Sequence, residues 1–279
     1  MWLALLAGGV AWAVEAPPLA KECFREPGPG PALAWCVTRL PGCDPGTVLY
    51  HLHGRNLDAG IWADPSYYTE LLKRHWQDSG LTPPTIVTIS YGPEWVLAPR
   101  GQAKRTGLRE QFLERALPGI EKGLGGTTRA RFLLGESMGG FNAIQLMDSG
   151  LFTRVAILCA PIYDIAYPIT MAGTLDLVRR TGMEYKIALG FWWLLGDYVQ
   201  SAGDWEAISP LRMAGSLDPA RAPMVYLSCG SRDQYGNFSG SLRFQETLRQ
   251  RGVNVQWRPL YTRHCGIDIP SLAEFLAVR

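Results

Sequence analysis

The sequence lacks an excess of charge of either sign. Its 279 residues include 27 basic and 25 acidic side chains, which leaves a formal net charge of +2, and the basic residues are scattered along the chain. Proteins that bind nucleic acid gather Lys and Arg into a patch or stripe that faces the phosphates. The charge pattern therefore argues against a nucleic-acid partner. No internal repeat or long polar run is present either, so the composition indicates an ordinary globular protein.

The sequence also lacks an N-terminal apolar run long enough to span a membrane. The run Met1–Val14 is shorter than the ~20 residues that a membrane-spanning helix needs. It ends in Ala11-Trp12-Ala13, a small-x-small pattern that a signal peptidase can cut. We therefore expect a signal peptide over residues 1–14 and a secreted or periplasmic protein without stable membrane insertion. The alternative is a buried N-terminal helix in a cytoplasmic protein, because no Lys or Arg precedes the run.

Metal-binding cysteine patterns are missing as well. The six cysteines include no C-x-x-C pair and no nearby cysteine-histidine cluster, so we expect no zinc site. Three of them lie close together near the N-terminus: Cys23, Cys36 and Cys43. In an exported protein, a disulfide within this group would stabilise residues 15–45, a segment with little periodic structure of its own. Three candidates leave the pairing open.

Short apolar runs alternate with longer helical patterns from Gly46 onward. This order is typical of an α/β fold with a mostly parallel central sheet and helices on both of its faces. The strand-like runs are dense in Val, Ile, Leu and Tyr, as burial on both faces requires. They span residues 47–52, 85–90, 131–134, 155–159, 224–228 and 255–260. Helical patterns occupy residues 66–77, 108–122, 139–148, 242–251 and 271–278. We predict one catalytic domain over residues 46–279.

One gap between strand-like runs is much longer than a crossover helix requires. Roughly sixty residues separate the run that ends at Cys159 from the run that begins at Met224. We expect a helical insertion at about residues 162–222, directly before the fifth strand-like run. It is rich in aromatic residues: Tyr163, Tyr167, Tyr185, Phe191, Trp192, Trp193, Tyr198 and Trp205. Some of these side chains are expected to pack the insertion onto the domain and others to line a pocket.

The strongest motif is Gly135–Gly140, with the sequence Gly-Glu-Ser-Met-Gly-Gly, which follows a strand-like run and opens a helical pattern. This is the G-x-S-x-G arrangement that places a serine hydroxyl on a sharp strand-to-helix turn above a sheet. The serine takes a strained backbone conformation, and the glycines leave room for the strand and the helix to approach. We therefore predict that Ser137 is a nucleophile. An ordinary glycine-rich turn is the alternative.

Histidine is scarce, which narrows the choice of a base for Ser137. A serine hydroxyl is a weak nucleophile and needs a base within hydrogen-bond reach. The chain has four histidines: His51, His53, His75 and His264. In this arrangement the base follows both the nucleophile and the acid along the chain. Only His264 satisfies that order, and it lies a few residues after the last strand-like run, where a loop can bring its imidazole to the serine.

The acid is expected in the loop after the fifth strand-like run. Asp233 lies there, and it would accept a hydrogen bond from the imidazole, fix its tautomer and stabilise the imidazolium that forms during attack. The rival is Asp268, which lies past the histidine and breaks the order of serine, acid and histidine. We predict a triad of Ser137, Asp233 and His264, with an ordinary turn aspartate as the alternative for Asp233.

The oxyanion that forms on attack needs two preorganised backbone N–H donors. The N–H of Met138, the residue after the nucleophile, is the first expected donor. His53-Gly54-Arg55 follows the first strand-like run, so the N–H of Arg55 is the second expected donor. His51 and His53 would then position this loop. Their H-x-H spacing also suits a metal ion, but no third ligand is evident nearby, so we prefer the structural role.

At these motifs the chain resembles the Putative esterase family of α/β hydrolases. That family includes esterase D, feruloyl and acetylxylan esterases, enterochelin esterases and the mycolyltransferase antigens. The resemblance runs from about Gly46 to the C-terminus and is most specific at Ser137–Gly140, with Asp204–Pro210 in support. It implies an α/β-hydrolase fold with the triad and the oxyanion donors at the residues named above. The segment before Gly46 is too short for the additional N-terminal domain of enterochelin esterases.

The predicted reaction is hydrolysis of a carboxylic ester through an acyl-enzyme, with no cofactor. We expect a small-molecule or carbohydrate-linked ester as substrate, and the Trp and Tyr content of the insertion hints at a bulky aromatic one. An acyltransferase could use the same residues, and the mycolyltransferases share the fold while transferring acyl groups to sugars. A catalytically silent binding protein with this fold is the second alternative. The filled catalytic positions argue against it.

Overall fold

The computed structural model describes residues 20–27, 31–94, 107–196 and 198–279. The expected signal peptide, residues 1–14, lies outside the described residues. Within the described part of the chain, no helix is both long enough and apolar enough to cross a bilayer.

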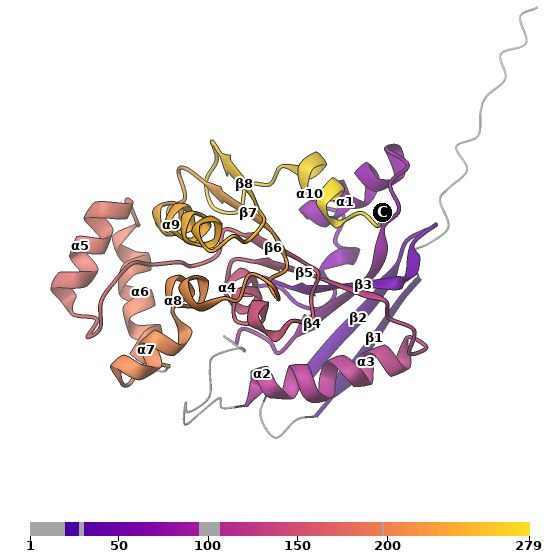
Figure 1. Ribbon diagram of the computed structural model, residues 1–279, viewed down its shortest axis with the longest axis horizontal. Coiled ribbons are helices and arrows are strands. Elements are labelled where there is room, and N and C mark those ends of the chain that lie inside the picture. Colours follow the sequence, from indigo (N-terminus) through magenta and orange to yellow (C-terminus); the bar gives the residue numbers. More distant parts are fainter. Residues whose placement is uncertain (1–19, 28–30, 95–106, 197) are drawn as a thin grey trace, which may run out of the picture.

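A mixed sheet forms the centre of the described structure (Figure 1). Its eight strands follow the order β1-β2-β4-β3-β5-β6-β7-β8. Strands β3 to β8 pair in parallel, while β1 and β2 are antiparallel to their neighbours. The bounds are β1 (Ala20–Glu26), β2 (Leu33–Arg39), β3 (Asp44–Leu52), β4 (Pro84–Ser90), β5 (Ala130–Glu136), β6 (Arg154–Leu158), β7 (Met224–Gly230) and β8 (Val255–Leu260). All six predicted strands are present, and the expected mostly parallel sheet is confirmed.

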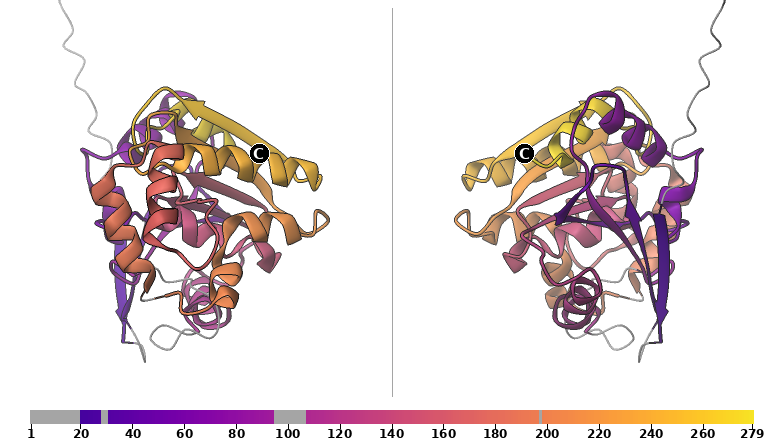
Figure 2. Two further views of the ribbon diagram at one scale, coloured as in Figure 1. Left: turned by 90° about the vertical axis from the view of Figure 1, so that its left-hand side faces the viewer. Right: turned by 90° about the vertical axis from the view of Figure 1, so that its right-hand side faces the viewer.

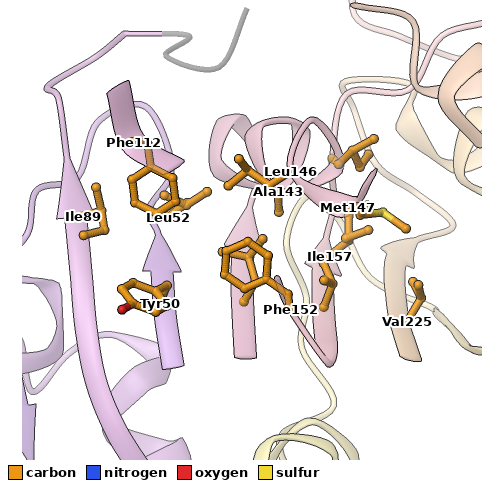
Figure 3. Packing of buried hydrophobic residues seen from close by; sticks show 14 of the residues in the cluster. Tyr50, Leu52, Ile89, Phe112, Ala143, Leu146, Met147, Phe152, Ile157 and Val225 are labelled. Atoms are coloured by element: carbon orange, nitrogen blue, oxygen red, sulfur yellow. The ribbon is translucent and has the colours of Figure 1, made fainter. Parts of the chain in front are cut away.

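Helices cover both faces of this sheet because neighbouring strand residues point to opposite hydrophobic clusters. Leu49 belongs to the cluster on the side of the sheet that α1 and α10 cover. Tyr50 belongs to the cluster on the other side, which α2, α3, α4, α8 and α9 cover. Phe112 and Phe152 meet the Tyr50 ring edge-on, each with ring centroids 6.2 Å away, in the cluster that Figure 3 shows. The bounds are α1 (Tyr68–Asp78), α2 (Leu108–Gln111), α3 (Leu117–Gly123), α4 (Met138–Ile144), α8 (Pro210–Ser216), α9 (Asn237–Gln250) and α10 (Ile269–Leu276).

The helix predicted over residues 108–122 is interrupted. A π-helical turn, Phe112–Ala116, joins α2 to α3. Pro118 explains the interruption, because proline has no N–H to donate to the carbonyl of Glu114 and its ring crowds that carbonyl. Phe112 and Ala116 remain buried, so the wider turn keeps the apolar face of this segment on the sheet.

The N-terminal segment adds two strands that the sequence pattern did not predict. Figure 2 shows these indigo strands, β1 and β2, at one margin of the molecule. Cys23 and Cys36 lie directly opposite each other in the β1–β2 register and form a disulfide. Cys43, the third cysteine of this group, is a free thiol. The expected disulfide within the group is therefore present, and it joins the edge strand β1 to its antiparallel neighbour β2.

Helices α5 to α8 occupy the described chain between β6 and β7, where we expected an insertion. The first three are α5 (Met171–Thr181), α6 (Tyr185–Gly196) and α7 (Ala202–Ile208), and Figure 1 shows them beside the sheet. Their aromatic residues divide into two groups. Those buried include Tyr163, Tyr198 and Trp205, while Tyr185, Trp192 and Trp193 are exposed. Trp192 and Trp193 also line an open pocket together with Tyr167 and Val199.

The turn from β5 into α4 depends on glycine at two positions. A Cβ atom on Gly135 would overlap the carbonyl oxygen of Gly139. A Cβ atom on Gly139 would overlap the carbonyl oxygen of Leu52 and crowd that of His53. The first turn of α4 therefore rests directly on the backbone at the end of β3.

Gly139→Ala should lower the free energy of unfolding by about 3 kcal/mol, because the added methyl group meets backbone that cannot move without shifting β3. The matched control is Gly119→Ala. Gly119 is exposed in α3, and a Cβ atom there meets nothing within 4 Å, so this variant should be as stable as the parent or slightly more so. Urea unfolding measures both. Equal midpoints for the two variants would contradict the close backbone contact.

Candidate active site

Ser137 occupies the strained turn that the motif predicts. Its φ of 51° and ψ of −116° lie outside the regions that L-residues ordinarily adopt. The backbone N–H of Ser137 donates to the carbonyl of Leu158 at the end of β6, with 2.9 Å between the nitrogen and the oxygen. This bond to the neighbouring strand and the glycine contacts beside it hold the turn in place.

The structure brings the three residues of the predicted triad together. Ser137, Asp233 and His264 lie on loops that follow β5, β7 and β8, so all three stand at the carboxyl edge of the parallel strands. The Nε2 atom of His264 is 3.1 Å from the Oγ atom of Ser137. Its Nδ1 atom is 2.9 Å from the Oδ2 atom of Asp233. The imidazole can thus accept the serine proton on one side while the carboxylate holds its other N–H.

Further contacts orient the Asp233 carboxylate, whose side chain is fully buried, and one of them is the Sγ atom of Cys229, 3.7 Å from Oδ2. The backbone N–H of Tyr235 donates to Oδ1 at 2.7 Å, and the Nδ2 atom of Asn237 donates to Oδ2 at 3.2 Å. The Tyr235 ring also packs against the His264 imidazole, with centroids 4.2 Å apart. Sequence reasoning missed Asn237, because an asparagine at the start of a helix gives no sign of this contact.

Asp268, the rival acid, serves a different purpose. It is the N-cap of α10, where its Oδ1 atom accepts a hydrogen bond from the backbone N–H of Ser271 at 3.2 Å. Capping of this kind satisfies one of the helix's first N–H groups, which have no partner within the helix. The geometry therefore favours Asp233 as the partner of His264.

The two expected oxyanion donors lie on segments that pack against each other. Met138 is the first residue of α4, so its backbone N–H has no partner within the helix. Arg55 lies in the turn after β3, directly beyond the buried Gly54. A Cβ atom on Gly54 would sit against the side chain and carbonyl of Glu136, in ordinary van der Waals contact. The Arg55 loop is thus adjacent to the turn that carries the nucleophile.

His51 and His53 are both buried beside this loop. The Nδ1 atom of His53 lies 2.7 Å from the carbonyl oxygen of Gly54, so it carries the proton and donates it. Burial lowers the pKa of His53, which keeps the ring neutral. The Nδ1 atom of His51 accepts a hydrogen bond from the indole N–H of Trp62 at 2.9 Å. The proton of a neutral His51 must therefore be on Nε2.

That tautomer directs the Nε2–H of His51 toward a buried carboxylate that sequence reasoning missed. Glu136 is the residue before the nucleophile and is 1% exposed. Its Oε1 atom lies 3.5 Å from Nε2 of His51, slightly beyond an ordinary hydrogen bond, and neither atom has another partner among the described residues. Its Oε2 atom accepts a hydrogen bond from the hydroxyl of Tyr67 at 2.6 Å. Burial, together with the charge of Glu136, raises the pKa of Tyr67 and keeps it protonated.

A second disulfide lies beside the predicted base. Cys159, directly after β6, is bonded to Cys265, the neighbour of His264 in sequence. Cys159, His264 and Cys265 also form the group of closely spaced potential metal ligands in the described part of the chain. Two sulfurs that are bonded to each other cannot both serve as thiolate ligands, so this arrangement suits a disulfide rather than a metal ion. Sequence reasoning did not pair these cysteines.

The parallel sheet and its strand, turn and helix around Ser137 define an α/β hydrolase. Residues 40–263 match the model of the Putative esterase family, and the chain belongs to that family. The match includes Ser137 and Asp233 and ends one residue before His264. The protein is accordingly a carboxylic-ester hydrolase. The resemblance seen at the sequence motifs is thereby confirmed.

Solved structures with the same fold extend over nearly the whole chain. A ferulic acid esterase matches with a TM-score of 0.63 and 19% identity over 92% of this chain and 96% of its own. An S-formylglutathione hydrolase from Agrobacterium tumefaciens has a TM-score of 0.59 and 14% identity, with 92% and 96% covered. The fluorophosphonate-binding serine hydrolase F of Staphylococcus aureus has a TM-score of 0.59 and 16% identity, with 92% and 95% covered. No curated protein sequence matches significantly.

Glu136→Gln should lower the free energy of unfolding by about 1–3 kcal/mol. The carboxylate accepts a hydrogen bond from Tyr67 and faces the Nε2–H of His51 at 3.5 Å, whereas an amide has only one oxygen and would present N–H groups to one of these two neighbours. Glu114→Gln is the matched control, because Glu114 is exposed and its change should stay within about 0.5 kcal/mol. Urea denaturation measures both. A Glu136→Gln protein as stable as the control would argue against the tautomer assigned to His51.

Proposed function

We propose that this protein is a serine esterase that hydrolyses carboxylic esters through a Ser137–His264–Asp233 triad and an acyl-enzyme intermediate. The observation that carries the proposal is the continuous chain of contacts from the Ser137 hydroxyl through both nitrogens of His264 to the buried Asp233 carboxylate. A nucleophile and a base within hydrogen-bond reach, with a third group orienting the base, is the arrangement that activates a serine hydroxyl.

The reaction follows from the positions of these groups. His264 takes the proton of the Ser137 hydroxyl at Nε2 as the serine oxygen attacks the ester carbonyl. The backbone N–H groups of Met138 and Arg55 stabilise the negative charge on the former carbonyl oxygen. His264 then gives its proton to the leaving alcohol, which releases it and leaves the acyl group on Ser137. Water then enters and loses a proton to His264 as its oxygen attacks the acyl carbon. The bond from that carbon to the Ser137 oxygen breaks, the acid leaves, and His264 returns the proton to the serine oxygen. These steps use no cofactor.

The exposed aromatic side chains of the insertion support an aromatic or carbohydrate-linked ester as the substrate. Trp192 is 42% exposed and Trp193 is 72% exposed, and both line the open pocket beside Tyr167. Exposed indole rings offer flat apolar surfaces on which aryl groups and the apolar faces of sugars can stack. A structural neighbour is named as a ferulic acid esterase, which is consistent with an aromatic acyl group. Transfer of the acyl group to a sugar rather than water would use the same triad.

A fluorophosphonate probe should label Ser137 covalently, because the strained turn and His264 make this one hydroxyl reactive. Ser137→Ala should abolish both labelling and hydrolysis of p-nitrophenyl esters. Hydrolysis rates for p-nitrophenyl esters of increasing acyl length, for methyl ferulate and for acetylated sugars report the substrate class. Saturating alcohol acceptors would reveal acyl transfer by diverting the acyl group from water. Labelling that persists in Ser137→Ala would rule out the assigned nucleophile.

Asp233→Asn should lower kcat by several orders of magnitude while the protein stays folded. In a well-studied protease the equivalent change costs about ten-thousandfold, because the amide favours the wrong histidine tautomer. Asp268→Asn is the matched control and should leave kcat nearly unchanged, since asparagine caps a helix as well as aspartate does. Steady-state kinetics and thermal unfolding of both variants decide the matter. A large loss confined to Asp268→Asn would transfer the acid role to that residue.

A further inference from the structure

The Cys159–Cys265 disulfide closes a ring of contacts around the proposed triad. Cys265 follows His264 in the chain, and His264 contacts Asp233 through Nδ1 at 2.9 Å. The Nδ2 atom of Asn237 donates to Asp233 at 3.2 Å and also to the backbone carbonyl of Cys159 at 3.1 Å. The ring therefore runs from base to acid to Asn237 to Cys159 and back through the disulfide to the base.

Cys159 is the fixed side of this ring. It is 1% exposed, and its backbone N–H donates to the carbonyl of Ser228 in β7 at 2.8 Å. The preceding residue, Leu158, accepts the backbone hydrogen bond of Ser137. The disulfide therefore fixes Cys265 to the end of β6, and the same end of β6 also holds the turn that carries Ser137.

The His264 loop is the less constrained side. Eight residues, 261–268, connect β8 to α10, and they contain no helix or strand. Thr262 is held through its carbonyl by the backbone N–H of Arg232 at 3.0 Å. The backbone N–H of His264 donates to the side chain of Gln234 at 3.2 Å. The Tyr235 ring packs against the imidazole, and the Arg232 guanidinium lies over the Tyr261 ring, so the noncovalent contacts named here all come from the loop after β7. The disulfide is the covalent restraint, and it joins the loop to a different strand end, that of β6.

We propose that the Cys159–Cys265 disulfide positions His264 for proton transfer, so that reducing it lowers turnover while substrate binding is retained. The proposal rests on the esterase function argued above. Neither sulfur touches the reacting atoms, so the two cysteines act through the histidine as positioning residues. A displacement of about 1 Å in a catalytic group can cost about a hundredfold in rate, which makes such a restraint valuable.

The Cys159–Cys265 disulfide is reduced by thiol–disulfide exchange with a dithiol such as dithiothreitol. A thiolate of the reductant attacks the sulfur of the half-buried Cys265, and the sulfur of Cys159 leaves as a thiolate and takes up a proton. The second thiol of the reductant then attacks the mixed disulfide and releases the thiol of Cys265. The enzyme gains two electrons and two protons, and the reductant becomes a cyclic disulfide. Burial raises the pKa of the thiol of Cys229, the free cysteine that contacts Asp233, and a protonated thiol is a poor nucleophile for exchange.

The experiment follows the wild-type enzyme through a titration with dithiothreitol. At each step, mass spectrometry of alkylated protein gives the fraction of Cys159–Cys265 reduced, and steady-state kinetics with a p-nitrophenyl ester gives kcat and KM. We expect kcat to fall about tenfold to a hundredfold in step with that fraction, with KM changing by less than about twofold. The rate of fluorophosphonate labelling should fall in parallel, and reoxidation should restore both.

Two paired variants separate this disulfide from the other one. Cys159→Ala/Cys265→Ala should have the low kcat of the reduced enzyme from the start and should not respond to dithiothreitol. Cys23→Ala/Cys36→Ala, which removes the disulfide between the edge strands, should behave like the wild type. A merely stabilising disulfide would lower the thermal unfolding temperature and leave kcat at lower temperature unchanged. If the first variant does not fold, the reversible titration of the wild type decides.

An enzyme that keeps its full kcat with Cys159–Cys265 reduced would overturn the proposal and leave the esterase assignment intact. An oxidised wild-type protein that hydrolyses no ester and resists fluorophosphonate labelling would instead overturn the proposed function. The two failures are therefore distinguishable.

Discussion

The contact of one backbone segment with another, where α4 begins against the end of β3, is the constraint on which the site depends. Gly139 meets the carbonyl of Leu52 with no side chain between them. Because neighbouring parallel strands are about 4.8 Å apart, a helix that starts between two strand ends can approach this closely only with glycine at the contact. The approach brings the Arg55 loop beside the Ser137 turn, so the two segments that carry the proposed oxyanion donors become neighbours.

Buried and half-buried polar side chains near this contact also fix the arrangement of the site. Trp62, His51, Glu136 and Tyr67 form a line of donors and acceptors that connects the end of β3 and the helix α1 to the residue before the nucleophile. Such buried polar groups are costly unless they are paired, and a paired set permits only one arrangement of its members. The strained backbone of Ser137 thus follows directly on a buried carboxylate that Tyr67 holds by a hydrogen bond.

Much of the fold could be predicted because the parallel strands are buried on both faces, and their apolar runs are therefore distinct from the helices. The contact between Ser137 and His264 could be predicted because the motif and the order of the residues along the chain restrict the choice. Strands β1 and β2 could not, since β1 lies at the edge of the sheet with charged residues among its apolar ones, and β2 is only partly buried. The role of Glu136 and the pairing of Cys159 were also missed, because both depend on which distant strand ends become neighbours.

The separation of the proposed triad residues along the chain bears on how the protein folds. Ser137 and His264 are 127 positions apart, and the parallel pairing of β5, β6, β7 and β8 must form before they meet. Ordering so much chain ahead of a contact has a large entropic cost, which makes folds of this topology slow to form. A chain that has formed only the turn at Ser137 lacks the proposed base. On the proposed mechanism, the reactivity of Ser137 therefore requires the parallel pairing from β5 to β8 to be complete.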